Sequence, residues 1–338
     1  MSVAHTIYVP GPSSSSSPSR APKSGERYVV RSEIGRGGCA VVYEAYDRRL
    51  ARLVALKVVR KDARDAHAGT RLAREARAAA AIHHPNVCGL LDAGHLADRR
   101  PYLVMERLHG ETLTNCLRRL RQLSIADAVD IALQLLAALG AAHAAGIVHR
   151  DVKPDNVFLL PRIGCGPLVK LLDFGMCRRV NKTVRDDATL TRAGQVVGTP
   201  EYMAPEQVSG QREFGARIDV WAVGVILYEA LSGQRAFPGK DAREIVLSVL
   251  VKNLPPLASV RPDVLPSLER VVSRALEREA SSRYASAAEF RDDLLELTTR
   301  YDRRPAPPQT GRRLIDNDNT DESAAWDAPT RHVPKRTA

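Results

Sequence analysis

Two short polar motifs place carboxylate, amide and lysine groups close together along the chain. The first, residues 149–156 (HRDVKPDN, the HRD loop), follows a long apolar segment, and the second, residues 173–175 (DFG), begins 17 positions after Asn156. In such an arrangement Asp151 can accept the proton of an attacking hydroxyl, while Asn156 and Asp173 can hold magnesium beside a phosphate. Any one of these groups could be an ordinary loop residue. The two motifs in this order and spacing indicate phosphoryl transfer.

A glycine-rich turn between two predicted strands is a second phosphate-binding feature. Residues 34–42 read IGRGGCAVV. Glycines at a strand turn let backbone amides approach phosphate oxygens with no Cβ in the way. An ordinary hairpin would also contain glycine, so this segment is weak evidence by itself. The sequence has no GxxxxGK[ST] motif, so the turn is not the phosphate loop of nucleoside triphosphatases.

A lysine and a glutamate 18 positions apart could complete the phosphate site. Lys57 ends the third predicted strand, and Glu75 lies on the helix predicted after it. Lys57 could orient the α- and β-phosphates of a nucleotide, with Glu75 holding it as an ion pair. The alternatives are a solvated strand lysine and a surface helix glutamate.

The chain divides into a strand-rich part followed by a helical part. Runs of β-branched residues separated by glycine or charged turns predict an antiparallel meander with strands at 28–34, 41–46 and 54–59. Further strands are expected at 87–91, 102–105 and 169–172. Alanine-rich or apolar stretches predict helices at 70–82, 125–145, 218–231, 268–276 and 286–297. The segment 161–167 is expected to be a surface turn. We therefore expect an α+β fold with a small strand-rich lobe and a larger helical lobe.

Composition and charge exclude several classes. The 338 residues, 44% hydrophobic and 26% charged, suit a soluble globular protein with one large two-lobed domain or two ordinary ones. The net charge of +11 could favour nucleic acid, but the basic residues are scattered and not interleaved with aromatics, so no nucleic-acid surface is expected. No apolar run approaches the ~18 residues of a membrane span. The N-terminus has no signal-peptide pattern.

The cysteines and the two ends of the chain complete this outline. The five cysteines are widely spaced and form no CxxC pair, which indicates reduced thiols and a cytoplasmic protein. Residues 1–25 are rich in Pro and Ser, and residues 301–338 are polar and contain several prolines. Both are expected to be disordered tails around a single domain at 26–300.

These motifs together resemble the eukaryotic-like serine/threonine protein kinases, bacterial type, from about Tyr28 to about Leu297. The order is complete: the glycine-rich turn, Ala55-Leu56-Lys57, Glu75, His84-Pro85-Asn86, the HRD loop, DFG, Ala204-Pro205-Glu206, then Asp219, Trp221 and Arg283. The segment 198–206 (GTPEYMAPE) looks most like bacterial members. The resemblance implies a bilobal protein kinase fold, with an N-lobe at 26–108, a C-lobe at 109–300, and ATP and Mg²⁺ between them.

The resemblance also implies a nucleotide site. Met105 would lie beside the adenine, and Glu106 and Leu108 would offer it backbone hydrogen bonds. The other implied ATP contacts come from the glycine-rich turn and from both sides of the base: Ile34, Gly35, Gly37, Gly38, Val42, Ala55, Lys57 and Phe158. Without the motifs, Val42, Ala55 and Phe158 would be assigned to the core.

Substrate class follows from two further matches. Lys153, two residues after Asp151, fits the serine/threonine pattern and could neutralise the transferred phosphoryl group. Thr199 resembles the threonine that lines the acceptor pocket. The expected partners are therefore proteins with serine or threonine acceptors, and by resemblance a homodimer through the N-lobe is possible.

Regulation is implied by the residue before Asp151. Arg150 is typical of kinases activated by phosphorylation between the DFG and Ala-Pro-Glu motifs. Thr189 and Thr191 have the Thr-x-Thr spacing of bacterial relatives, so we expect autophosphorylation there; solvated loop threonines are the alternative. The same resemblance implies structural roles for His149, Arg150, Phe174, Gly175, Asp219, and for Arg283 as the partner of Glu206.

Two residues depart from the family pattern. Ala40 replaces the third glycine of the turn, and Ala79, one turn after Glu75, is smaller than the residue usually packed against Phe174. Ala40 is expected to stiffen the turn modestly without abolishing binding. Because of Ala79, the active arrangement is expected to be loosely packed and to need help from a partner or from phosphorylation. Cys39 could be redox-sensitive or an ordinary loop residue.

Two other functions compete with the kinase. A pseudokinase scaffold would have no reason to keep Lys57, Asp151, Asn156 and Asp173 together. A small-molecule phosphotransferase would not need the Ala-Pro-Glu segment and Arg283, which build a platform for protein substrates.

Overall fold

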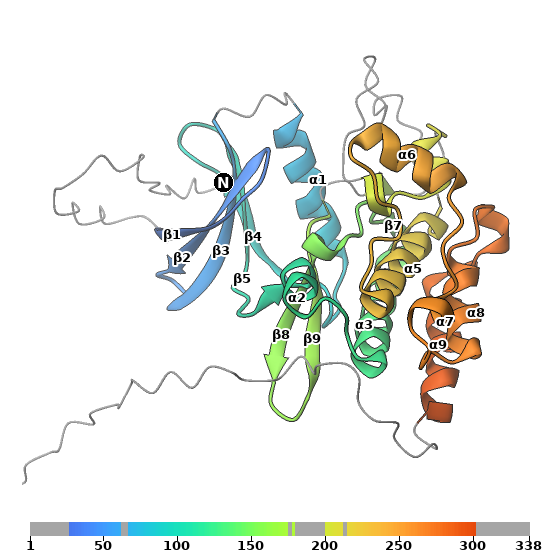
Figure 1. The fold of residues 1–338 in the computed structure, drawn as a ribbon. Coiled ribbons are helices and arrows are strands. Elements are labelled where there is room, and N and C mark those ends of the chain that lie inside the picture. The colour runs from blue at the N-terminus through green and yellow to red at the C-terminus, as the bar shows by residue number, and fades with distance from the viewer. Residues whose placement is uncertain (1–26, 62–66, 175–177, 180–199, 212–214, 302–338) are drawn as a thin grey trace, which may run out of the picture.

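The computed structural model describes residues 27–61, 67–174, 178–179, 200–211 and 215–301, which form two lobes (Figure 1). The N-lobe is an antiparallel sheet in the order β1-β2-β3-β5-β4, with one helix against it. Its elements are β1 (Tyr28–Arg36), β2 (Ala40–Asp47), β3 (Arg52–Val59), α1 (Ala68–Ala81), β4 (Leu90–His95) and β5 (Pro101–Glu106). Buried side chains such as Tyr28, Leu56 and Val104 form the core of the sheet.

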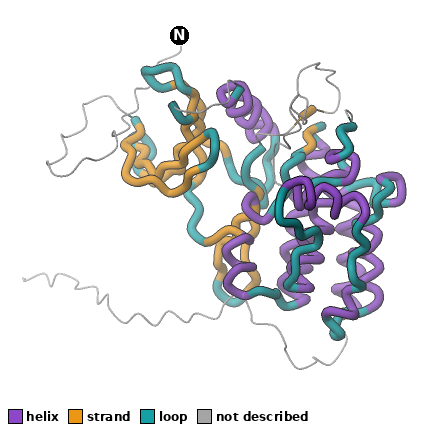
Figure 2. Tube along the Cα trace, turned by 45° about the horizontal axis from the view of Figure 1, so that its top comes forward, coloured by secondary structure: helices purple, strands orange, loops and turns teal. Residues whose placement is uncertain are grey.

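The C-lobe is mainly helical, and Figure 2 shows most of the helices, drawn in purple, in this lobe. It begins with β6 (Glu111–Thr112), α2 (Leu113–Leu120), α3 (Ile125–Ala144), β7 (Ile147–Val148), η1 (Pro154–Asn156), β8 (Val157–Arg162), β9 (Cys165–Leu171) and β10 (Arg178–Arg179). It continues with η2 (Pro200–Tyr202), α4 (Pro205–Val208), α5 (Arg217–Ser232), α6 (Ala242–Val251), α7 (Leu257–Val260), α8 (Pro266–Ala275), η3 (Ala280–Ser282) and α9 (Ala287–Tyr301). The α+β fold class expected from the sequence is confirmed.

Two central helices carry the C-lobe. The side chain of Ser124 caps α3 by accepting the backbone N–H of Asp127 at 3.0 Å, and the helix packs against α5, α9 and β9. In α5 every residue from Ile218 to Ser232 is buried, and the helix ends at Gly233, whose φ of 71° suits glycine. These two helices support the HRD loop.

Helix α3 is long and apolar enough to cross a membrane, with a mean hydropathy of 1.7, and it is the single helix of this kind among the described residues. Half of it is buried inside the C-lobe. Its packing against three C-lobe elements accounts for its apolar composition.

The structure corrects the predicted elements in two places. The strand predicted at 87–91 is β4, which starts only at Leu90 and runs to His95, while Val87 forms an isolated bridge to Leu171. The expected surface turn at 161–167 is mostly strand, because β8 and β9 pair as far as Arg162 and Cys165. The elements that were not predicted are helices α2, α4, α6 and α7 and strands β6, β7, β8 and β10.

Candidate active site

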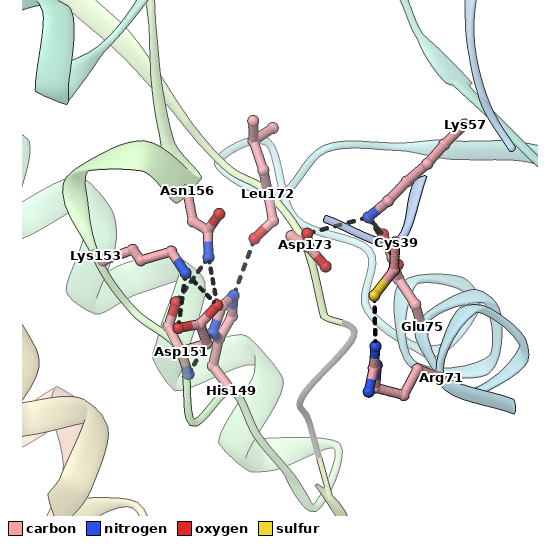
Figure 3. A network of polar contacts seen from close by, with 10 residues as sticks. All are labelled: Cys39, Lys57, Arg71, Glu75, His149, Asp151, Lys153, Asn156, Leu172 and Asp173. Carbon is pink, nitrogen blue, oxygen red and sulfur yellow. Dashed lines mark hydrogen bonds and ion pairs between the residues drawn. The ribbon is translucent and has the colours of Figure 1, made fainter. Parts of the chain in front are cut away.

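Lys57, Glu75 and Asp173 form one group of charges where the two lobes meet (Figure 3). Packing of α1 against β3 brings Glu75 to Lys57. The Nζ of Lys57 donates to both carboxylate oxygens of Glu75, at 2.8 and 2.9 Å, and lies 3.1 Å from Oδ2 of Asp173. The ammonium is thereby held in one position, as phosphate binding requires.

Burial and neighbouring charges set the protonation of this group. The side chains of Lys57 and Glu75 are 13% and 5% exposed, whereas that of Asp173 is 42% exposed. Burial raises the pKa of Glu75 to about 7; Lys57 opposes this shift and Asp173 adds to it. Burial disfavours the charge of Lys57, but its pKa stays above the ordinary value because Asp173 and Glu75 face it. One ammonium thus serves two carboxylates, and Asp173 is the one more available to a cation.

In the HRD loop the side chains of Lys153 and Asn156 both contact Asp151 (Figure 3). The Nζ of Lys153 donates to the two carboxylate oxygens of Asp151, at 2.9 and 2.7 Å. The Nδ2 of Asn156 donates to the backbone carbonyl of Asp151 at 2.8 Å and to its Oδ2 at 3.2 Å. Pro154 starts the η1 turn that turns the chain from Lys153 to Asn156. The carboxylate of Asp151 is therefore oriented by two donors.

Asp219, on α5, fixes the backbone of this loop. It is 1% exposed and accepts the backbone N–H groups of His149 and Arg150, each at 2.9 Å, while its Oδ2 lies 2.8 Å from Nε2 of His143. Burial alone would raise the pKa of Asp219, but these bonds and the nearby histidines hold it below the ordinary value. Arg150 has a φ of 71°, which is unfavourable for a residue with a Cβ. The bonds to Asp219 stabilise this conformation.

The chain after β9 brings Asp173 to the same place. Nε2 of His149 lies 3.0 Å from the carbonyl of Leu172, and the ring of Phe174 packs 4.7 Å from that of His149. Phe174 is 2% exposed. Asp173, between these two anchored residues, has a φ of 60°, so its conformation is held by its neighbours.

Asn156 and Asp173 are the groups that would hold Mg²⁺. The amide nitrogen of Asn156 is engaged with Asp151, which leaves the amide oxygen for a cation. No cluster of three or more His, Cys, Asp or Glu side chains suited to a metal occurs in the described part of the chain. Mg²⁺ commonly uses one or two protein oxygens together with phosphates and water, so this pair fits a cation that arrives with a nucleotide.

The register of the N-lobe sheet places the implied adenine contacts on one face. Val42 pairs with Lys57, and Ala55 pairs with Met105. Paired residues share a face of a sheet, as do residues two positions apart, so these four side chains lie on the same side. Phe158 lies on β8 in the other lobe. A base between the lobes could therefore be enclosed from both sides.

The glycine-rich turn joins β1 and β2 at the edge of this face. The backbone N–H of Gly37 donates to the carbonyl of Ala40 at 2.8 Å, which closes a tight turn, and a Cβ at Gly38 would meet nothing within 4 Å. Ile34 is 40% exposed. Nη2 of Arg71 lies 3.0 Å from the Sγ of Cys39, so α1 contacts the turn directly (Figure 3).

Two ion pairs near the chain that links the lobes were not predicted. The first joins β5 to β9: Oε1 of Glu106 accepts from Nζ of Lys170 and from the backbone N–H of Gly89, both at 2.7 Å. The backbone N–H of Glu106 also donates to the carbonyl of Gly89 at 3.1 Å. A charged residue within each otherwise apolar strand was the sequence signal for this pair.

The second ion pair joins β2 to residue 107. Nε of Arg107 donates to Oε2 of Glu44 at 3.0 Å, and its Nη1 donates to the carbonyl of Leu108. Glu44 pairs with Ala55, so it lies on the same face of the sheet as Val42. A partly buried charge pair therefore borders the implied adenine position. Arg107 also binds the carbonyl of Leu108, a residue whose backbone the resemblance assigns to the nucleotide.

The Ala-Pro-Glu segment is joined to the C-lobe by the expected pair. Nη1 and Nη2 of Arg283 donate to the two carboxylate oxygens of Glu206, at 2.7 and 2.8 Å. The Arg283 guanidinium also lies 4.9 Å from the ring centre of Trp221. Nε2 of Gln207 donates to the carbonyl of Arg150 at 3.3 Å, which links this segment to the HRD loop.

Some expected residues cannot be placed. Thr189, Thr191, Thr199 and Gly175 lie outside the described residues. Ala79 lines a narrow gap together with Met105, Phe174 and other side chains. The loose packing expected there stays a prediction.

Residues 28–295 match the family model for the protein kinase domain, and the chain belongs to that family. It is 38% identical over 286 residues to serine/threonine-protein kinase pkn3 of Myxococcus xanthus and 38% identical over 287 residues to serine/threonine-protein kinase PknA of Mycobacterium tuberculosis. These matches cover 84% and 83% of this chain. They cover 52% and 63% of the two relatives, so the chain spans between half and two thirds of their length.

Proposed function

We propose that this chain is a serine/threonine protein kinase that transfers the γ-phosphoryl group of ATP, bound with Mg²⁺, to protein hydroxyls. The observation that carries the proposal is a pair of charge groups built from segments far apart in the sequence. In the first group Lys57 lies 3.1 Å from Asp173, and in the second Lys153 lies within 2.9 Å of Asp151. A scaffold protein has no use for this arrangement, and relatives named as serine/threonine kinases support the same function.

Each side chain has one task in this reaction. Lys57 binds the α- and β-phosphates, and Asp151 accepts the proton of the serine or threonine hydroxyl as its oxygen attacks the γ-phosphorus. Lys153 stabilises the negative charge of the group in transfer. The bond from the γ-phosphorus to the bridging oxygen breaks, and ADP leaves. Magnesium supplies charge neutralisation on the phosphates when it is bound.

The test is incorporation of labelled phosphate from MgATP into the chain itself and into a general acceptor such as casein. Wild type should label, and Asp173→Ala should reduce labelling to background. Glu289→Gln, on an exposed pair of α9, is the matched charge control and should label like wild type. Absence of labelling in wild type despite ATP binding would contradict the proposal and favour a pseudokinase.

Activation by autophosphorylation at Thr189 and Thr191 is the finer part of this proposal. Mass spectrometry after incubation with ATP should find phosphate on residues 183–199, and an unmodified segment would contradict it. The cytoplasm is the proposed location. Among the described residues Cys39, Cys88, Cys116 and Cys165 are free thiols, which supports it. A homodimer through the N-lobe is tested by the molar mass of the chain in solution.

A further inference from the structure

Arg235 places a guanidinium beside the segment that leads into α4. It lies in the loop after α5, and its Nη1 donates to the hydroxyl of Tyr202 at 3.2 Å and lies 3.9 Å from Oε1 of Glu201. The hydroxyl of Tyr202 donates to Oε2 of Glu229 at 2.8 Å, and Oε1 of Glu229 accepts the backbone N–H of Ala236 at 3.1 Å. The guanidinium therefore contacts η2 directly, and Glu229 of α5 binds both Tyr202 and the backbone next to Arg235.

Three carboxylates act on this guanidinium. Glu229 is buried, Glu201 is partly buried, and Asp155 is exposed in the η1 turn of the HRD loop. Burial lowers the pKa of Arg235, but the net pKa is raised because the neighbouring tyrosine and these three carboxylates favour the charged form. The side chain of Arg235 is still 56% exposed, so it faces solvent as well as its partners.

These residues border the path of an acceptor peptide under the proposed function. Asp155 is four residues after Asp151, which would take the hydroxyl proton. Glu201 lies in η2, four residues before the start of α4, and the bond from Gln207 to Arg150 ties α4 to the HRD loop. Asp155 thus belongs to the HRD loop itself, and Glu201 belongs to the segment that leads into α4, which is bonded to that loop.

We propose that Arg235 is a specificity-determining residue: it takes, from within the chain, the position that a basic substrate side chain would occupy beside Asp155 and Glu201. A substrate arginine there would meet a guanidinium in place of unpaired carboxylates. The substrates are therefore serine or threonine segments with neutral or acidic neighbours. This inference rests on the proposed function, and it names the substrate class of the same site.

The test compares peptides that share one acceptor. A neutral parent peptide is compared with variants that carry a single arginine at each of the four positions before and after the acceptor. For wild type, kcat/KM should not rise with any arginine. For Arg235→Ala, the ratio of kcat/KM between the best arginine peptide and the parent should rise at least tenfold, because charge-assisted hydrogen bonds become available. Arg235→Lys keeps the cation and should behave like wild type.

Two further variants separate specificity from structure. Arg235→Ala/Glu201→Gln should lose most of the gain, whereas the parent peptide should react at a similar rate with every variant. Arg235→Gln gives the same comparison if Arg235→Ala does not fold. Transfer to the parent peptide with an unchanged ratio in these variants overturns the inference alone and makes Arg235 a structural residue. Absence of transfer by wild type to any peptide or to itself overturns the proposed function, and this inference with it.

Discussion

Removing the carboxylate that faces Arg283 should strongly destabilise the C-lobe. The side chain of Arg283 is 0% exposed, two of its nitrogens bind Glu206 at 2.7 and 2.8 Å, and it also donates to three backbone carbonyls. Glu206→Leu would leave this buried cation without its anion, which costs about 3–5 kcal/mol. Since 1 kcal/mol shifts the Tm of a large domain by about 2–4 °C, the Tm should fall by roughly 6–20 °C.

Thermal unfolding followed by circular dichroism measures this effect. Glu206→Leu/Arg283→Met should regain part of the lost stability, because removing both charges of a buried pair is often nearly neutral. The recovery is partial because carbonyls that now accept from Arg283 lose their donor. Glu289→Gln is the matched control: Glu289 pairs with Arg274, but the two side chains are 37% and 43% exposed, so the loss should stay below about 1 kcal/mol.

Two results would refute this reasoning. One is a Glu206→Leu variant that unfolds within about 1 kcal/mol of wild type. The other is a double variant whose loss of unfolding free energy equals the sum of the losses of its two single variants, which would mean that the two charges do not stabilise each other.

Three further predictions concern the site. Burial, with a contribution from Asp173, raises the pKa of Glu75 to about 7. As the pH falls through 7, Glu75 takes up a proton and no longer holds Lys57 as an ion pair, so ADP binding without magnesium should weaken. Asp173→Asn should move this transition to lower pH; calorimetry that finds no pH dependence contradicts it. Asp219→Asn puts an amide against the backbone N–H groups of the HRD loop, so kcat should fall about 10- to 100-fold with little change in the KM for ATP. Arg107→Ala should raise the KM for ATP several-fold, and the charge-reversed variant Glu44→Arg/Arg107→Glu should bring the KM part of the way back to the wild-type value. A KM that is the same in the single and the double variant would rule out a role for the pair.

Local patterns located about half of the elements, mainly the longer strands and helices, because each of these has its own signal in the sequence. The apolar run at 218–231 corresponds to α5, and alternating β-branched runs correspond to β1, β2 and β3. The predictions failed where long-range pairing decides. Val87 bridges to Leu171, which leaves β4 to start later, and β8 pairs with β9 through a segment whose Pro and Gly indicated a turn.

The sequence by itself determined the residue types that can do the chemistry and their order along the chain. Residues 149–156 and 173–175 were sufficient to indicate phosphoryl transfer, because the residue types needed for one reaction occur together in short motifs.

The Lys57–Glu75 and Glu206–Arg283 pairs were expected from the sequence. Only the tertiary structure shows that Asp173 shares Lys57 with Glu75, and that Arg235 lies next to Glu201. Charge interactions depend on separations of a few ångströms and on burial. Both arise from the packing of segments that lie far apart in the sequence, so no local pattern contains them.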